Sequence, residues 1–455
     1  MRLLRFARND INEITMNLKT QFPLLFKTLE ILVVFLAVAL VNLNSLVRIR
    51  QFPEVDNYSD HEGNYILAAL LTTLLMIVLL RADGQLGKYF QAWGRNKPLI
   101  LFLAYATVSL LWTVYLPATL YKLIFLIFSS LAGAYLAVRY QVRGVLNALC
   151  WVGAVFAILS LLVIVNFPLI GIMQNRPFIG SWVGIFWHRN HTGNLFAFFS
   201  MLFLLRIVMD GEASRIRKLL FAVLYLLSAA MVFGSRSATG VIVYLFLHFA
   251  AFLTIFWLRV RERLKPWHYY LAGALLLAGF LIFITNTAFF FSLLGRSANM
   301  TGRIPLWQDL FSRVYMQEPV LGYGYGALWM QKSFRIAMQI HHGWLYQVYF
   351  ADNGFFDILL NTGLVGLLLF LGVYLTMGLR AYRQAVTLKS WIHFVPLLTF
   401  LYIFIGNLTY SFLLEVDQFV WMLLVVMAFL TSTPSRINNA QPYSQPSRTN
   451  AENEV

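Results

Sequence analysis

The sequence contains little charge for its length. Only 12% of its 455 residues are Asp, Glu, Lys or Arg, whereas 60% are hydrophobic. A soluble domain has about a quarter charged residues, so a soluble fold of this composition would have to bury far more apolar surface than such folds do. There is one cysteine, Cys150, inside an apolar run. This excludes a disulfide framework and a thiolate metal site.

Long apolar runs are abundant instead. Runs of about 20 residues, the length of a helix that crosses a bilayer core, recur along the whole chain. We therefore predict an all-α polytopic membrane protein with about twelve transmembrane helices. The expected spans are 29–47, 64–81, 98–115, 119–138, 144–166, 192–209, 217–234, 237–257, 269–290, 354–378, 391–407 and 416–432.

Acidic residues are also scarce. The sequence has 19 Asp and Glu but 35 Lys and Arg, which gives a net charge of +16. Most basic residues fall in alternate loops, which predicts a cytoplasmic position for those loops and for both termini. No compact basic domain is present to bind nucleic acid. Residues 1–432 are expected to form a single integral membrane domain. The tail at 433–455, rich in Ser, Asn, Gln, Pro and Glu, is predicted to be disordered and cytoplasmic.

Three outward-facing segments are expected to form the active site: the loop at 167–191, the turn at 234–240, and a large insert at 291–353 between spans 9 and 10. Each combines arginine with Trp, His, Ser or Gly. A guanidinium group offers paired donors to phosphate oxygens, so several converging arginines would suit a diphosphate head group. The alternatives are that they balance anionic lipids or pair with Asp309 and Glu318. The candidate diphosphate ligands are Arg236, Arg296, Arg303 and Arg189.

Asp352 and Asn353 lie where the insert re-enters the membrane. A carboxylate at that rim is a candidate general base. Alternatively, both residues cap the helix that follows. His341 and His342 are further candidate acids or bases. We expect no metal and no cofactor, because the outward loops show no compact carboxylate cluster.

Aromatic residues are frequent in the outward segments. Most are expected in an interfacial belt, but a few beside the arginines are candidates to stack on sugar rings. The candidate sugar-binding residues are Trp307, Tyr323, Tyr325 and Asn353. Gly363 and Gly366, in the re-entering span, are expected to let a neighbouring helix approach closely.

Three motifs together resemble the O-antigen ligase and O-antigen polymerase family, with the exopolysaccharide polymerase branch as the closest part. They are G-S-W-V-G-I-F-W-H-R-N-H-T-G (180–193), L-G-R-S-A-N-M-T-G-R-I-P-L-W (294–307) with the following P-V-L-G-Y-G-Y-G-A-L-W, and D-N-G-F-F-D-I-L-L-N-T-G-L-V-G (352–366). The third is similar to a family pattern that usually begins with histidine. Asp352 stands in that position here.

The resemblance implies a GT-C-like membrane glycosyltransferase that works without a metal. It would polymerise oligosaccharide repeat units carried on undecaprenyl diphosphate, at the outer face of the bacterial inner membrane. One alternative is a ligase that transfers the glycan to a lipid core or a protein. A second is a transporter or flippase for the lipid-linked sugar, which would place polar residues near mid-span. The expected partners are the lipid-linked substrate and membrane lipids, with a polysaccharide flippase and a chain-length regulator as further candidates.

Overall fold

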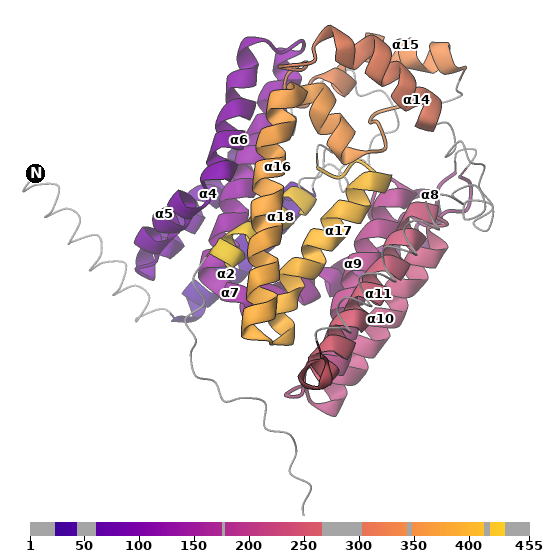
Figure 1. Cartoon of the computed structure of the whole chain (residues 1–455). Coiled ribbons are helices and arrows are strands. Elements are labelled where there is room, and N and C mark those ends of the chain that lie inside the picture. Colours follow the sequence, from indigo (N-terminus) through magenta and orange to yellow (C-terminus); the bar gives the residue numbers. More distant parts are fainter. Residues whose placement is uncertain are drawn as a thin grey trace, which may run out of the picture.

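The structure is a computed structural model that describes residues 23–42, 61–174, 178–265, 303–343, 348–413 and 419–432. Within these ranges the regular elements are helices, arranged as a bundle with an additional cluster of short helices above one end (Figure 1). The α-helices are α2 (Pro23–Val41), α4 (His61–Ala82), α5 (Leu86–Arg95), α6 (Lys97–Val108), α7 (Leu116–Asn166), α8 (Pro168–Gly171), α9 (Arg189–Met209), α10 (Arg215–Gly234), α11 (Ala238–Val260), α14 (Arg303–Asp309), α15 (Lys332–His342), α16 (Gly354–Leu388), α17 (Val395–Thr409) and α18 (Phe419–Ser432).

The prediction of an all-α polytopic membrane protein is confirmed. Among the described residues, eight helices are long and apolar enough to cross a bilayer. One of them, α7, has 51 residues and a non-helical residue at Gln141, so it covers the predicted spans 119–138 and 144–166. Two shorter apolar helices, Lys97–Leu111 and Phe419–Ser432, match the spans predicted at 98–115 and 416–432. The predicted span 269–290 and the tail 433–455 lie outside the described residues.

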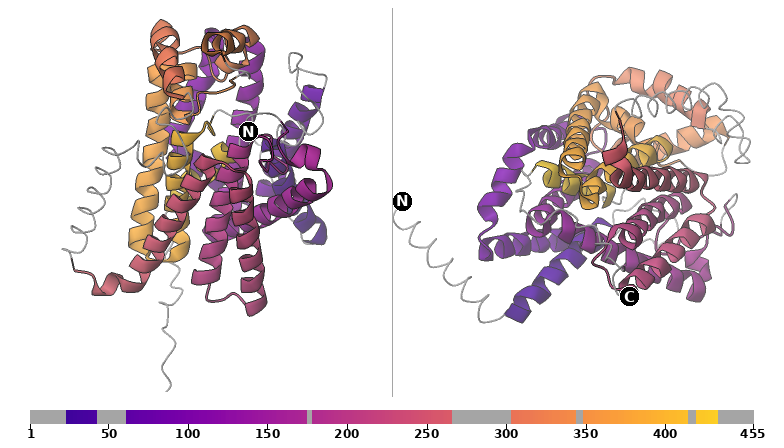
Figure 2. Two further views of the ribbon diagram at one scale, coloured as in Figure 1. Left: turned by 90° about the vertical axis from the view of Figure 1, so that its right-hand side faces the viewer. Right: turned by 60° about the horizontal axis from the view of Figure 1, so that its bottom comes forward.

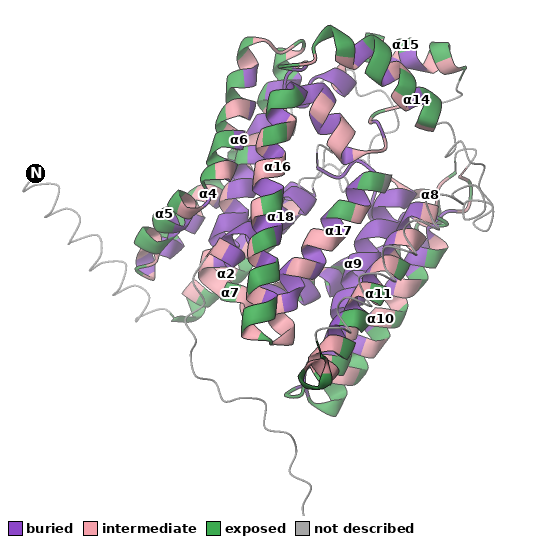
Figure 3. Ribbon diagram, in the orientation of Figure 1, coloured by how far each residue is buried: buried purple, intermediate pink, exposed green. Residues whose placement is uncertain are grey.

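Two helices form the centre of the bundle. Nearly every residue of α18 is buried, as is most of α9, whereas α10 and α16 expose apolar side chains along one face (Figure 3). Helices α10 and α11 both pack against α9. The approach of α9 to α11 is close enough that a Cβ added to Gly240 would lie 2.7 Å from the Cα atom of Gly193. The beginning of α9 is therefore held rigidly against the beginning of α11.

Several of the basic loops meet at the end of the bundle away from the short helices. Arg380, near the end of α16, donates to the carbonyl oxygen of Arg95 and to Asn96 Oδ1, both at 2.9 Å. Arg261 donates to the carbonyl oxygen of Lys389 at 3.1 Å. The loop charges predict that these segments lie on the same side of the membrane, and in the fold they lie at the same end of the bundle.

The insert folds into short helices above the beginning of α16 (Figures 1 and 2). It is fastened there by backbone hydrogen bonds: Leu364 N–H donates to the Pro319 carbonyl at 2.9 Å, and Gly324 N–H donates to the Asn361 carbonyl at 2.9 Å. Gly363 breaks α16 with a φ of +63°, and a Cβ there would lie 2.2 Å from the Val320 carbonyl oxygen. Gly363 thus permits a close approach, as predicted, but the neighbour is a turn of the insert at Val320 and not a helix.

Candidate functional site

An ion pair joins the two ends of the described insert. Arg303 begins α14 and Asp352 precedes α16, and Arg303 Nε lies 3.0 Å from Asp352 Oδ2. The backbone of Asp352 has a φ of +55°, a left-handed conformation that costs free energy outside glycine. The other carboxylate oxygen, Oδ1, is buried and has no hydrogen-bond partner among the described residues. One oxygen is therefore held by the arginine, while the other retains its capacity to accept a hydrogen bond.

Asn353 has a different role from its neighbour. Its Oδ1 accepts the backbone N–H groups of Phe355 and Phe356, both at 3.1 Å, so it caps α16. The capping alternative thus describes Asn353, whereas the side chain of Asp352 pairs with Arg303. A contact between Asn353 and a sugar stays a prediction.

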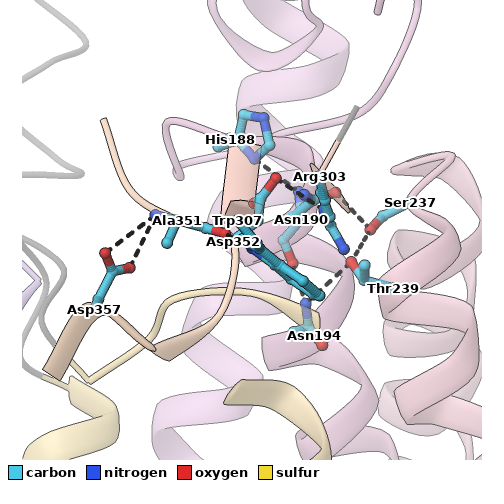
Figure 4. A network of polar contacts seen from close by, with 10 residues as sticks. All are labelled: His188, Asn190, Asn194, Ser237, Thr239, Arg303, Trp307, Ala351, Asp352 and Asp357. Carbon is cyan, nitrogen blue, oxygen red and sulfur yellow. Dashed lines mark hydrogen bonds and ion pairs between the residues drawn. The ribbon is translucent and has the colours of Figure 1, made fainter. Parts of the chain in front are cut away.

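The segment that carries Asp352 is held from both sides (Figure 4). Trp307 Nε1 donates to the Ala351 carbonyl oxygen at 2.6 Å. On the other side, Ala351 N–H lies 3.1 Å from both carboxylate oxygens of Asp357, and Trp329 Nε1 donates to Asp357 Oδ1 at 2.6 Å. The sequence analysis missed Asp357, although a carboxylate inside an apolar run is by itself a signal of a functional position.

Two of the predicted arginines meet where α9 begins and α10 ends. Arg189 Nη1 donates to the backbone carbonyl of Arg236 at 2.6 Å. The Arg189 side chain is buried against the ring of Phe178, with Cζ 4.0 Å from the ring centroid. The Arg236 side chain is exposed, and its Nη1 reaches the Ile179 carbonyl at 3.4 Å. Arg189 therefore supports the turn that presents Arg236. Arg296 lies outside the described residues.

A buried polar network ties the beginning of α9 to the beginning of α11. Ser237 Oγ donates to Asn190 Oδ1 at 2.8 Å and lies 2.8 Å from Thr239 Oγ1, which accepts from Asn194 at 3.5 Å (Figure 4). We call Arg189 and these four side chains the floor of the site, and Arg303, Trp307 and Asp352 the roof. The unpaired N–H groups at the beginning of a helix favour anions. At the beginnings of α9, α11 and α16, however, side chains cap such groups: His188 caps α9, Ser237 caps α11 and Asn353 caps α16.

His188 connects the floor with the roof. Its Nδ1 accepts the backbone N–H of Asn190 at 3.2 Å, and its ring stacks on Tyr410 with the ring centroids 5.8 Å apart. Burial, followed by the positive charges of Arg189 and Arg303 among others, lowers the pKa of His188 to about 3. The ring is therefore neutral near pH 7, and because Nδ1 accepts a hydrogen bond, Nε2 carries the proton. His188 was not among the site residues predicted from the sequence.

His341 and His342 meet a different carboxylate. Their Nε2 atoms lie 2.7 and 3.1 Å from Asp309 Oδ2, at the end of α14. Asp309 also pairs with Arg313, at 3.5 Å. Arg313 is not one of the candidate diphosphate ligands, and of those Arg303 pairs with Asp352 and not with Asp309. Burial lowers the pKa of His342. The three groups are arranged so that they could hold a metal ion, which sequence spacing did not indicate because Asp309 is more than 30 residues away.

The two tyrosines of the G-Y-G-Y-G motif differ in exposure. Tyr325 is fully buried in the core, so its ring has no face open to a sugar, and we omit it from the sugar contacts. Tyr323 is partly exposed and donates its hydroxyl to the Val314 carbonyl at 2.7 Å. Burial raises the pKa of Tyr323. Tyr323 and Trp307 stay predictions as sugar contacts.

These features define a multi-pass helical membrane protein with a polar site where an insert meets the beginnings of three helices. The family model described as O-Antigen ligase matches residues 221–371, a range that contains Arg236, Arg303 and Asp352. The match confirms the resemblance to that family and indicates a membrane glycosyltransferase of the O-antigen ligase or polymerase type. The exopolysaccharide branch stays a prediction. No curated protein matches the chain.

Proposed function

We propose that this chain polymerises oligosaccharide repeat units carried on undecaprenyl diphosphate, at the outer face of the bacterial inner membrane. The observation that carries the proposal is the state of Asp352. One of its oxygens is held by Arg303, and the other is buried without a partner among the described residues. A carboxylate in this state is suited to accept the proton of an acceptor hydroxyl.

The donor side needs positive charge. When the bond between the anomeric carbon and the phosphate oxygen breaks, its electron pair stays on the leaving diphosphate. Arg236, with its exposed side chain, and Arg303, through the nitrogens that do not face Asp352, supply fixed charge for that group. Arg189 positions the Arg236 backbone, and Arg296 stays a candidate ligand. This arrangement stabilises the leaving group through side chains alone.

The acceptor side needs orientation and a base. An acceptor hydroxyl that donates to Asp352 Oδ1 is held in place as its oxygen attacks the anomeric carbon, and its proton passes to the carboxylate. The anchors on Ala351 from Trp307 and Asp357 fix the backbone beside Asp352. His188, neutral with Nε2 protonated, is a donor next to the pair and not a competing base.

The second candidate is a ligase that transfers the finished glycan to a lipid core or a protein, and the description of the matching family favours it. Both reactions use the same donor and differ in the acceptor. A transporter for the lipid-linked sugar is a third possibility. However, Ser237 and Asp352 lie at the beginnings of α11 and α16, and both beginnings are at the same end of the bundle (Figure 1). Transport would require polar groups along a path through the membrane.

The test is the surface-glycan profile of cells that lack this chain, rescued with wild type, Asp352→Ala or Asn353→Ala. Single repeat units in the deletion strain support a polymerase, and long carrier-bound chains support a ligase. An unchanged profile would remove both reactions. We expect Asp352→Ala to accumulate in the membrane and fail to rescue, while its neighbour Asn353→Ala rescues. Full rescue by Asp352→Ala would exclude this carboxylate as the base.

A further inference from the structure

A cluster of metal-ligating side chains lies at the far end of α14 from Arg303. Asp309 ends that helix, and His341 and His342 end α15. Both Nε2 atoms point at the same carboxylate oxygen, Asp309 Oδ2, at 2.7 and 3.1 Å. The three ligand atoms lie within 4.8 Å of one another. The chain thus brings two imidazoles and one carboxylate to a single point from helices that are distant in sequence.

The helix end contributes to the electrostatics of this cluster. The α15 helix stops at His342 because Gly343 adopts a left-handed conformation with a φ of +62°. The carbonyl end of a helix favours a positive charge within its last turn. His341 and His342 lie in that last turn, so a cation held by them also interacts favourably with the helix.

We propose that Asp309, His341 and His342 bind a divalent first-row transition ion, with zinc as the reference case. Imidazole nitrogens together with one carboxylate suit this class of ion, whereas calcium and magnesium require mainly oxygen ligands. With metal–ligand bonds of about 2.0–2.1 Å, ligand atoms in a tetrahedral shell lie about 3.3 Å apart. The two separations from Asp309, 2.7 and 3.1 Å, are close to that spacing, and the two imidazole nitrogens lie within 4.8 Å of each other. The side chains therefore need to move apart or together only slightly to hold the ion, and water completes the shell.

The ion would fasten α14 to α15. Arg303 begins the same helix that Asp309 ends, so anchoring Asp309 also restricts the position of Arg303 against Asp352. Asp352, the proposed base, is not one of the ligands. The role is structural, and the proposal does not depend on which glycosyl transfer the protein performs.

The test uses the full-length protein, purified through a tag without histidine and stripped with a chelator. Cobalt(II) is titrated in and followed by its visible absorption, then displaced with zinc. We expect one saturable equivalent in the wild type, and a loss of affinity of about tenfold or more in Asp309→Asn and His342→Ala. His393→Ala, on a separate short helix (Trp391–Phe394), is the matched control and should bind as the wild type does.

A second measurement separates metal binding from misfolding. Zinc should raise the melting temperature of the wild type and of His393→Ala, and leave that of Asp309→Asn unchanged. If His342→Ala fails to fold, His341→Ala decides the matter, because 41% of the His341 side chain is exposed and its loss is tolerated more easily. Absence of saturable cobalt binding in the wild type, or equal affinity in Asp309→Asn, would overturn the proposal.

Discussion

The floor and the roof of the site differ in how their polar groups are used. Each of the five floor side chains has at most 8% of its surface exposed, and the floor hydrogen bonds run between α9 and α11. In the roof, the Arg303 and Asp352 side chains are 17% and 27% exposed, and Asp352 Oδ1 has no partner among the described residues. The floor fixes the positions of α9 and α11 relative to each other, whereas the roof retains groups that can bind a substrate.

The sharpest test of this division is Arg303→Ala. Loss of a preorganised charge at a developing anion typically costs about a hundredfold or more in rate, so we expect a loss of that size in polymerisation by the purified protein. The melting temperature should change little, because the pair is partly exposed. Arg313→Ala is the matched control, since Arg313 also lies in the insert but pairs with Asp309. Similar losses in both variants would show that the roof acts only as a scaffold.

The corresponding test of the floor is Gly240→Ala. The added Cβ would lie 2.7 Å from the Cα atom and 2.8 Å from the carbonyl carbon of Gly193, and neither backbone atom can move away without shifting a helix. We expect destabilisation of about 1–3 kcal/mol, measured by thermal unfolding in detergent. Gly372→Ala, where an added Cβ meets nothing within 4 Å, is the control. An unchanged melting temperature in Gly240→Ala would contradict a rigid floor.

Asn353→Ala tests the boundary between the two regions. It removes the acceptor for two backbone N–H groups at the beginning of α16, at an expected cost of about 1 kcal/mol in stability. Activity should fall far less than in Asp352→Ala at a temperature where both variants are folded. Equal inactivation of the two variants would mean that the cap, and not the carboxylate, is what the site requires.

The smallest expected effect is the pH dependence contributed by His188. Its pKa of about 3 in the folded protein lies below the ordinary value of 6.5, so protonation favours the unfolded chain. Stability from this residue is complete above about pH 6.5 and declines as the pH falls toward 3. His188→Asn keeps a cap acceptor for α9 and should show a shallower loss of melting temperature between about pH 7 and pH 4. A parallel slope in the variant would show that His188 is not the titrating group.

The transmembrane helices were predictable because length and hydropathy alone distinguish them. The short helices of the insert were not predicted, since α14 has only seven residues and its position depends on contacts with α16. The motifs predicted both Arg303 and Asp352 as site residues. They are 49 residues apart, and no periodicity predicts that two such positions meet. Their pairing arises from the tertiary fold.

Other parts of the site were misjudged for related reasons. Tyr323 and Tyr325 have the same local sequence context, yet only Tyr325 is enclosed by the core. Ser237 and Thr239 are frequent residue types. Their role in the site comes from the hydrogen bonds that link Ser237 to both Asn190 and Thr239. In each case the deciding quantity was burial, which a single sequence does not contain.

The break at Gly363 has a consequence for how the protein is made. An unbroken α16 of 35 residues would extend about 52 Å, well beyond a hydrocarbon core of about 30 Å. The N–H groups of Leu364 and Val365 at the break bond to carbonyls of Pro319 and Val320, which belong to the insert. Synthesis makes the insert before α16, so these acceptor carbonyls already exist when the break forms. Without the insert these N–H groups would lose the acceptors that they have in the fold, so the break in α16 depends on the insert being packed against it as the chain folds.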